Sequence, residues 1–208
     1  MYAIIVSLAI CGVILFILFL RKIHTSENSK EHHVSKLYVD NSVIEFEGEQ
    51  IRSNGKVDSQ IPPGHFEELI ESLNRCSRYK EIYGNYKEYV AINNILKIGL
   101  LTRFVRQESF ARNEPTNYRA DLKYGGCYFE TTDGVAMVYA IGDTSTILEM
   151  CSQIHDKEEI LRIAQKWAKQ NYLVTAIATA DVYGDKKNVL TRGVKEKMTF
   201  LGLLAIPN

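Results

Sequence analysis

The four cysteines of this 208-residue chain have the most versatile chemistry, and their spacing favours no joint site. The chain has no C-x-x-C pair and no cluster of cysteines with histidines. A zinc module or a disulfide framework needs such spacing, so the sequence predicts neither. Cys127 has no catalytic signature around it, so we expect a half-buried strand cysteine rather than a nucleophile. The four are Cys11, Cys76, Cys127 and Cys151.

The adjacent histidines His32 and His33 invite a metal interpretation. Neighbouring side chains of an extended chain point to opposite faces, and no third ligand lies close by in the sequence. We therefore expect a solvated linker here and no metal site.

Motifs that bind phosphate or hydrolyse bonds are absent. The sequence has no G-x-x-x-x-G-K-[ST], G-x-G-x-x-G, H-E-x-x-H or G-x-S-x-G. Gly125-Gly126 and Gly142 lack the lysine that a P-loop requires. Spacing alone therefore predicts no catalytic residues, and an enzyme would need a nucleophile that no motif reveals.

Charge and composition exclude further classes. Lys plus Arg and Asp plus Glu number 25 each, which leaves no basic footprint for nucleic acid. A hydrophobic content of 46% excludes a disordered chain. The length suits one domain.

The first 20 residues carry no charge, and residues 2–20 form an apolar run. About 20 residues span a bilayer core, so we expect a transmembrane signal-anchor over residues 1–22. Arg21-Lys22 follows the run, which places the N-terminus outside and residues 21–208 in the cytoplasm. A cleaved signal peptide and a buried core helix are the alternatives. We expect a juxtamembrane linker over residues 23–35 and one cytosolic domain over residues 36–208, with reduced thiols.

Hydrophobic periodicity predicts helices and strands for this domain. We expect helices over residues 65–79, 86–106 and 144–153, and a fourth whose buried stripe is Ile160, Ile163, Ala164 and Trp167. Asp156-Lys-Glu-Glu159 resembles a capping box for that fourth helix.

The expected strands cover residues 36–39, 42–47, 127–141 as a hairpin, 173–179 and 198–206, with a polar turn after Tyr183. Residues 48–64 are predicted to be a loop, and residues 113–124 an irregular excursion. Because the strands cluster without regular βαβ alternation, we expect an α+β fold with a mostly antiparallel sheet flanked by helices.

Five patches resemble segments of the nucleotide-binding domain of P-type cation ATPases, in the family's order. The patch over residues 83–91 is similar to the Gly-Asp-Pro-Thr-Glu box, and residues 141–151 to the Lys-Gly-Ala-Pro-Glu segment with its following helix. The others are residues 109–113, 173–178 and 198–207. The resemblance covers nearly all of the proposed cytosolic domain.

The resemblance implies a domain that holds ATP for transfer to an aspartate elsewhere. It implies that Phe110 stacks on adenine, that Glu88 accepts from the adenine amino group, and that Arg112 meets a phosphate. Gly142, in the patch over residues 141–151, completes the implied nucleotide-binding set.

Several departures from the family weaken that site. Ile141, Pro115 and Leu173 stand where the family has cations, and each lost charge-assisted bond costs about 1.5–3 kcal/mol. The family's phosphorylated Asp-Lys-Thr-Gly-Thr motif is missing. The resemblance therefore implies neither ion pumping nor autophosphorylation by this chain.

Two functions remain as expectations. The first is a non-catalytic, membrane-anchored pseudoenzyme that acts by interaction with a membrane transporter or another membrane protein. The alternative is a membrane-tethered sensor that binds ATP or ADP through a weakened adenine pocket. No cofactor is predicted beyond that nucleotide.

Overall fold

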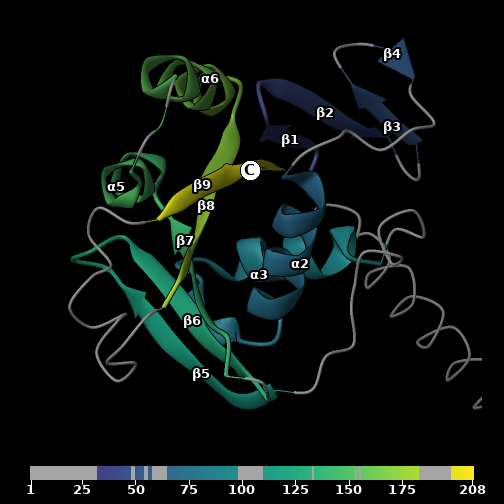
Figure 1. The fold of residues 1–208 in the computed structure, drawn as a ribbon. Coiled ribbons are helices and arrows are strands. Elements are labelled where there is room, and N and C mark those ends of the chain that lie inside the picture. The colour runs from purple at the N-terminus through teal and green to yellow at the C-terminus, as the bar shows by residue number, and fades with distance from the viewer. Residues whose placement is uncertain are drawn as a thin grey trace, which may run out of the picture.

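The computed structural model describes residues 32–47, 50–53, 56–57, 65–97, 110–132, 134–152, 154, 156–182 and 198–208. In these ranges the chain forms one nine-stranded antiparallel sheet of order β4-β3-β2-β1-β9-β8-β7-β6-β5 (Figure 1). The strands are β1 (Lys36–Val39), β2 (Ser42–Glu47), β3 (Gln50–Ser53), β4 (Lys56–Val57), β5 (Phe110–Arg119), β6 (Tyr124–Thr131), β7 (Ala136–Gly142), β8 (Tyr172–Asp181) and β9 (Thr199–Pro207). The helices are α2 (Phe66–Cys76), η1 (Lys80–Ile82), α3 (Tyr86–Ile95), α5 (Thr144–Met150) and α6 (Lys157–Lys169).

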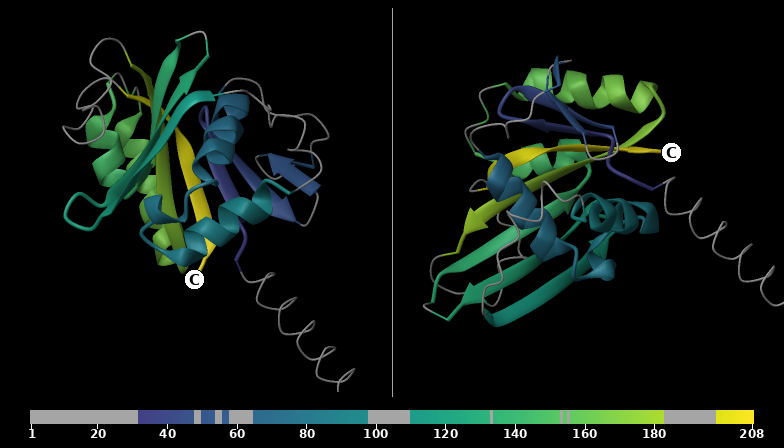
Figure 2. Two further views of the ribbon diagram at one scale, coloured as in Figure 1. Left: turned by 90° about the horizontal axis from the view of Figure 1, so that it is seen from below. Right: turned by 90° about the vertical axis from the view of Figure 1, so that its right-hand side faces the viewer.

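Helices cover both faces of the sheet (Figure 2). Alternate strand residues point to opposite faces, so β1 sends Leu37 into one core and Tyr38 into the other. The first core packs under α2, η1 and α3, and the second under α5 and α6. The expected α+β class with an antiparallel, helix-flanked sheet is confirmed.

The hairpin of β1 and β2 follows directly from the sequence. Asp40 and Asn41 have φ angles of 46° and 61°, as a two-residue turn with the twist of the strands requires. The carboxylate of Asp40 also accepts a hydrogen bond from the backbone N–H of His65 at 2.7 Å. This bond ties the turn to the start of α2.

Most of the other expected elements are confirmed. The structure has helices within residues 65–79 and 144–153, a hairpin within 127–141, and strands at 173–179 and 198–206. In α6, Ile160, Ala164 and Trp167 are buried, and Ile163 packs partly against the same core.

Two segments predicted to be irregular contain strands instead. β3 and β4 lie within residues 48–64, where charged residues at the end of the sheet hide the usual alternation. β5 replaces the excursion expected over residues 113–124 and pairs with β6. It contains Pro115, which an edge strand tolerates, and its register shifts twice along the ladder.

Two helix predictions need correction. The helix expected over residues 86–106 is α3, which ends at Ile95, and residues 98–109 lie outside the described ranges. The capping box expected at Asp156 does not form, because its side chain makes no cap hydrogen bond to α6. Its carboxylate instead accepts from Asn41 Nδ2 at 3.4 Å, which holds Asp156 against the β1–β2 turn.

Residues 32–35, predicted to belong to the linker, pack against the domain instead. The backbone carbonyl of His32 accepts from Asn94 Nδ2 at 2.9 Å, and Val34 is buried in the first core. The predicted anchor over residues 1–22 and the turn after Tyr183 lie outside the described residues. None of the helices in the described ranges is both long and apolar enough to cross a membrane.

Candidate functional site

Glu88 is the third residue of α3, and its carboxylate caps that helix. Asn85, the N-cap, accepts a hydrogen bond from the backbone N–H of Lys87 at 2.7 Å. The Glu88 carboxylate accepts in return from the backbone N–H groups of Asn85 and Gly84. The two side chains together form a capping box, which the sequence pattern Asn-x-x-Glu could have revealed.

Thr175 connects Glu88 to Gly142. The Thr175 side chain is buried in β8, hydrogen bonds to the Glu88 carboxyl group, and donates from Oγ1 to the Gly142 carbonyl at 3.1 Å. Burial raises the pKa of Glu88 to about 7, against the hydrogen bonds from Thr175 and the two backbone groups, which lower it.

The two protonation states of Glu88 use Thr175 differently. A hydroxyl group has one proton to donate. Protonated Glu88 donates to Thr175 Oγ1, which then donates to Gly142. Ionised Glu88 competes with the Gly142 carbonyl for that same proton. The arrangement can therefore hold a proton on Glu88, while Thr175 links that carboxyl group to the end of β7.

Gly142 lies where two backbone segments approach closely. A Cβ atom on Gly142 would lie 2.3 Å from the Lys123 carbonyl oxygen, so only glycine fits. The next residue, Asp143, caps α5 by accepting from the backbone N–H of Thr146 at 3.2 Å, and its own backbone N–H donates to the Lys123 carbonyl at 2.9 Å.

The structure does not bring all four predicted site residues together. Phe110 and Arg112 lie in β5 opposite Thr131 and Glu130 of β6. Gly142 lies opposite Tyr124, at the other end of β6. Tyr124 and Glu130 are six positions apart along β6, which corresponds to roughly 20 Å. Glu88 and Gly142 therefore meet through Thr175, whereas Phe110 and Arg112 lie at the far end of the ladder.

Tyr118, an aromatic residue that the sequence analysis missed, lies beside Glu88. A Cβ atom on Gly84 would lie 2.6 Å from Cζ of the Tyr118 ring, so the ring packs flat against this glycine. Burial raises the pKa of the Tyr118 hydroxyl, and the charges of Glu88 and Asp143 raise it further. Tyr118 is thus an aromatic side chain within electrostatic reach of both carboxylates.

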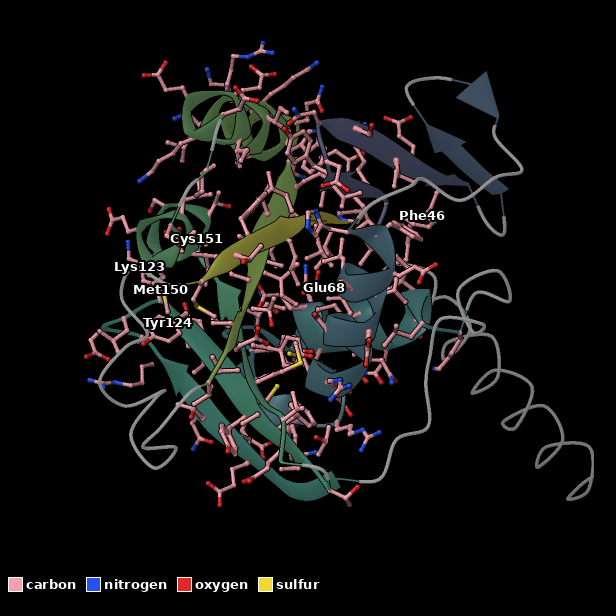
Figure 3. The ribbon with its side chains drawn as sticks, viewed as in Figure 1. Phe46, Glu68, Lys123, Tyr124, Met150 and Cys151 are labelled. Atoms are coloured by element: carbon pink, nitrogen blue, oxygen red, sulfur yellow. The ribbon has the colours of Figure 1, made fainter. Side chains whose placement is uncertain are left out.

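Lys123, also missed, supplies a cation at the same end of the sheet. It immediately precedes Tyr124 at the start of β6 (Figure 3). Partial burial raises the pKa of Asp143, but hydrogen bonds from Ser145 and Thr146 and the charge of Lys123 outweigh it, so the net pKa is lowered. One feature of the sequence could have pointed to Tyr118 and Lys123. Both precede the buried strand β6, whose first residue, Tyr124, lies opposite Gly142.

The sheet face beneath this cluster is filled by protein. η1 packs on β5 and β6 so closely that a Cβ atom on Gly125 would lie 2.2 Å from the Ile82 carbonyl oxygen. Ile141, which the resemblance aligns with a lysine, is 1% exposed in the first core. The aligned position therefore offers no charge to a ligand.

The opposite face of the sheet has an open groove of about 680 Å³ between α6 and the β1–β2 hairpin. Tyr38 and Trp167 form part of its lining and belong to the second core. Ion pairs stand along its rim, Lys36 with Glu45 at 2.7 Å and Arg162 with Glu159 at 2.6 Å.

No protein-family model matches the chain, and no curated protein matches it.

Proposed function

We propose that this chain is a non-catalytic, membrane-anchored pseudoenzyme that acts by binding a protein partner at the membrane, a transporter or another membrane protein. The observation that carries the proposal is the engagement of Glu88. Its carboxyl group is buried and already bonded to the α3 N-terminus and to Thr175, so it serves the fold. The burial of Ile141 supports the same conclusion, because a core side chain replaces a ligand-facing cation.

The groove between α6 and the β1–β2 hairpin is the surface that we propose for this partner. Protein interfaces combine buried aromatic side chains with a polar rim. Tyr38 and Trp167, each 3% exposed, form the aromatic floor of the groove, and the Lys36–Glu45 and Glu159–Arg162 pairs supply the rim that a partner would contact. Positively and negatively charged side chains are equally frequent along the groove. This mixed charge favours a protein surface over a polyanion as the partner.

Site-directed photo-crosslinking in the membrane tests this assignment. We expect Lys166→p-benzoyl-phenylalanine, in the groove, to cross-link to one membrane protein in native membranes. The matched control is Glu67→p-benzoyl-phenylalanine, an exposed position on α2 across the sheet. Equal cross-linking from both positions, or none from the groove, would contradict the assignment.

The second candidate is a membrane-tethered ATP or ADP sensor, and the position of Tyr118 favours it. An aromatic ring, a carboxyl group and a cation, from Tyr118, Glu88 and Lys123, gather at one end of the sheet beside Gly142. Base–aromatic stacking is worth about 1–3 kcal/mol, which supports weak binding without the missing cations.

Titration of ATP and ADP, followed by amide chemical shifts of the full-length chain, separates the two candidates. The interaction function predicts no shifts up to 10 mM nucleotide, an affinity weaker than about −3 kcal/mol. A sensor would give sub-millimolar shifts around Glu88 and Gly142 that Tyr118→Ala abolishes. Phe110→Ala is the matched control and should leave such binding unchanged, because Phe110 of β5 pairs with Thr131 at the far end of β6.

A further inference from the structure

Two fully buried cysteines face each other between α2 and the sheet. The Sγ atoms of Cys76 and Cys127 are 3.3 Å apart, and both residues are 0% exposed. Cys76 is the last residue of α2, and Cys127 lies in the middle of β6. Both are free thiols, so one pair links the end of a helix to a central strand.

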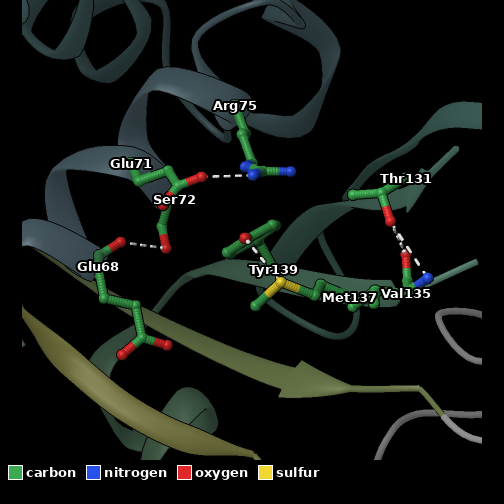
Figure 4. A network of polar contacts seen from close by, with 8 residues as sticks. All are labelled: Glu68, Glu71, Ser72, Arg75, Thr131, Val135, Met137 and Tyr139. Carbon is green, nitrogen blue, oxygen red and sulfur yellow. Dashed lines mark hydrogen bonds and ion pairs between the residues drawn. The ribbon is translucent and has the colours of Figure 1, made fainter. Parts of the chain in front are cut away.

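Polar and aromatic groups surround the two sulfur atoms. The guanidinium of Arg75 lies over the rings of Phe129 and Tyr139, 5.2 and 5.8 Å from their centroids. It also forms an ion pair with Glu71 (Figure 4). The hydroxyl of Tyr83 is buried near both sulfurs and has no hydrogen-bond partner among the described residues. The cysteines therefore lie in a polar enclave of the first core.

We propose that Cys76 and Cys127 form a redox latch, in which exchange with a small-molecule disulfide such as oxidised glutathione joins their sulfurs and ties the end of α2 to β6. One thiolate attacks the glutathione disulfide and releases one reduced glutathione. The second thiolate then attacks the mixed disulfide and releases the other. The two cysteines are oxidised by two electrons, and their two protons end on the two glutathione thiols.

Burial of the two thiols prevents this exchange in the closed packing of the first core. It raises the pKa of the Cys127 thiol well above its usual range, and the thiolate is the reactive form. The exchange must therefore follow an opening of the last turn of α2, because helix ends open more readily than helix centres. In a reducing cytoplasm the two cysteines remain thiols, and the disulfide forms only under oxidising conditions.

The closed latch restrains more than α2. η1 begins at Lys80, four positions after Cys76, and covers β5 and β6, while α3 follows at Tyr86 and carries Glu88. The disulfide therefore restrains the end of α2, from which η1 and α3 continue over this face of the sheet. This consequence is independent of the partner and of any nucleotide.

The test equilibrates the full-length chain, in detergent, with glutathione buffers of increasing oxidised fraction, followed by acid quenching, alkylation and mass measurement. We expect a loss of two hydrogen atoms without a glutathione adduct, and a non-reduced peptide that joins Cys76 to Cys127. Hydrogen exchange over α2 and η1 should slow at least about tenfold after oxidation. Cys151→Ala is the matched control and should change none of this, since Cys151 donates to the Ile147 carbonyl on the other side of the sheet.

The mass measurement on the wild-type chain decides the proposal even where Cys76→Ala or Cys127→Ala fails to fold. Glutathione adducts on Cys76 or Cys127, a cross-link to another cysteine, or two thiols that remain alkylatable after denaturation at every buffer ratio would each overturn it.

Discussion

The carboxyl group of Glu88 connects α3, β7 and β8, so its protonation should affect stability. Its pKa of about 7 lies above the ordinary value of 4.5, which means that the folded chain binds this proton more tightly than the unfolded chain. The stabilisation is complete below about pH 4.5 and is lost as the pH rises through about 7. The full effect is of the order of 3 kcal/mol.

The variant Glu88→Gln tests this prediction. Glutamine keeps an acceptor for the backbone N–H of Asn85 and a donor for Thr175, but it does not titrate. In urea unfolding, we expect the variant and the wild type to match at pH 5, and the variant to be more stable at pH 8. Glu149→Gln, at an exposed position of α5, is the control that should leave the pH dependence unchanged. A wild-type slope that persists in Glu88→Gln would assign the titration to another group.

At the scale of elements, local patterns predicted most of the fold. The turn at Asp40-Asn41 and the buried stripe of α6 could be predicted because each depends on residues close in sequence. β3, β4 and β5 could not, because these strands lie at the two ends of the sheet and carry many polar residues. Their pairing depends on neighbouring strands that are distant in sequence. In β5, Pro115 indicated an irregular segment, because proline is tolerated in a strand only at the edge of a sheet, and the sequence does not show which strands are at the edge.

The candidate site was harder to predict than the fold. Glu88 and Gly142 could be identified from short patches, yet their link through Thr175 needs three elements to meet. Phe110 was placed by its neighbours in sequence, whereas the register of β5 with β6 carries it to the far end of the ladder. Tyr118 lies in the register shift between Thr116 and Arg119 at the other end of β5, where it comes within electrostatic reach of Glu88.

At the scale of the whole molecule, the two faces of the sheet differ in how open they are. On the α2–η1–α3 face the backbone of η1 packs directly on β6, whereas the α6 face has the open groove. A membrane anchor before residue 23 would hold both faces near the bilayer, which raises the local concentration of any membrane partner. The proposed interaction function would therefore depend on the predicted anchor as well as on the groove.

The predicted anchor over residues 1–22 can be tested directly. The first 20 residues carry no charge and Arg21-Lys22 follows them, which favours a span with the basic pair on the cytoplasmic side. We expect the full-length chain to remain in the membrane pellet after alkaline carbonate extraction, and a chain of residues 23–208 to be released. Added protease should digest the domain in inverted vesicles and spare it in right-side-out ones. Release of the full-length chain by carbonate, or a mature N-terminus beyond residue 20, would replace the anchor with a peripheral or processed protein.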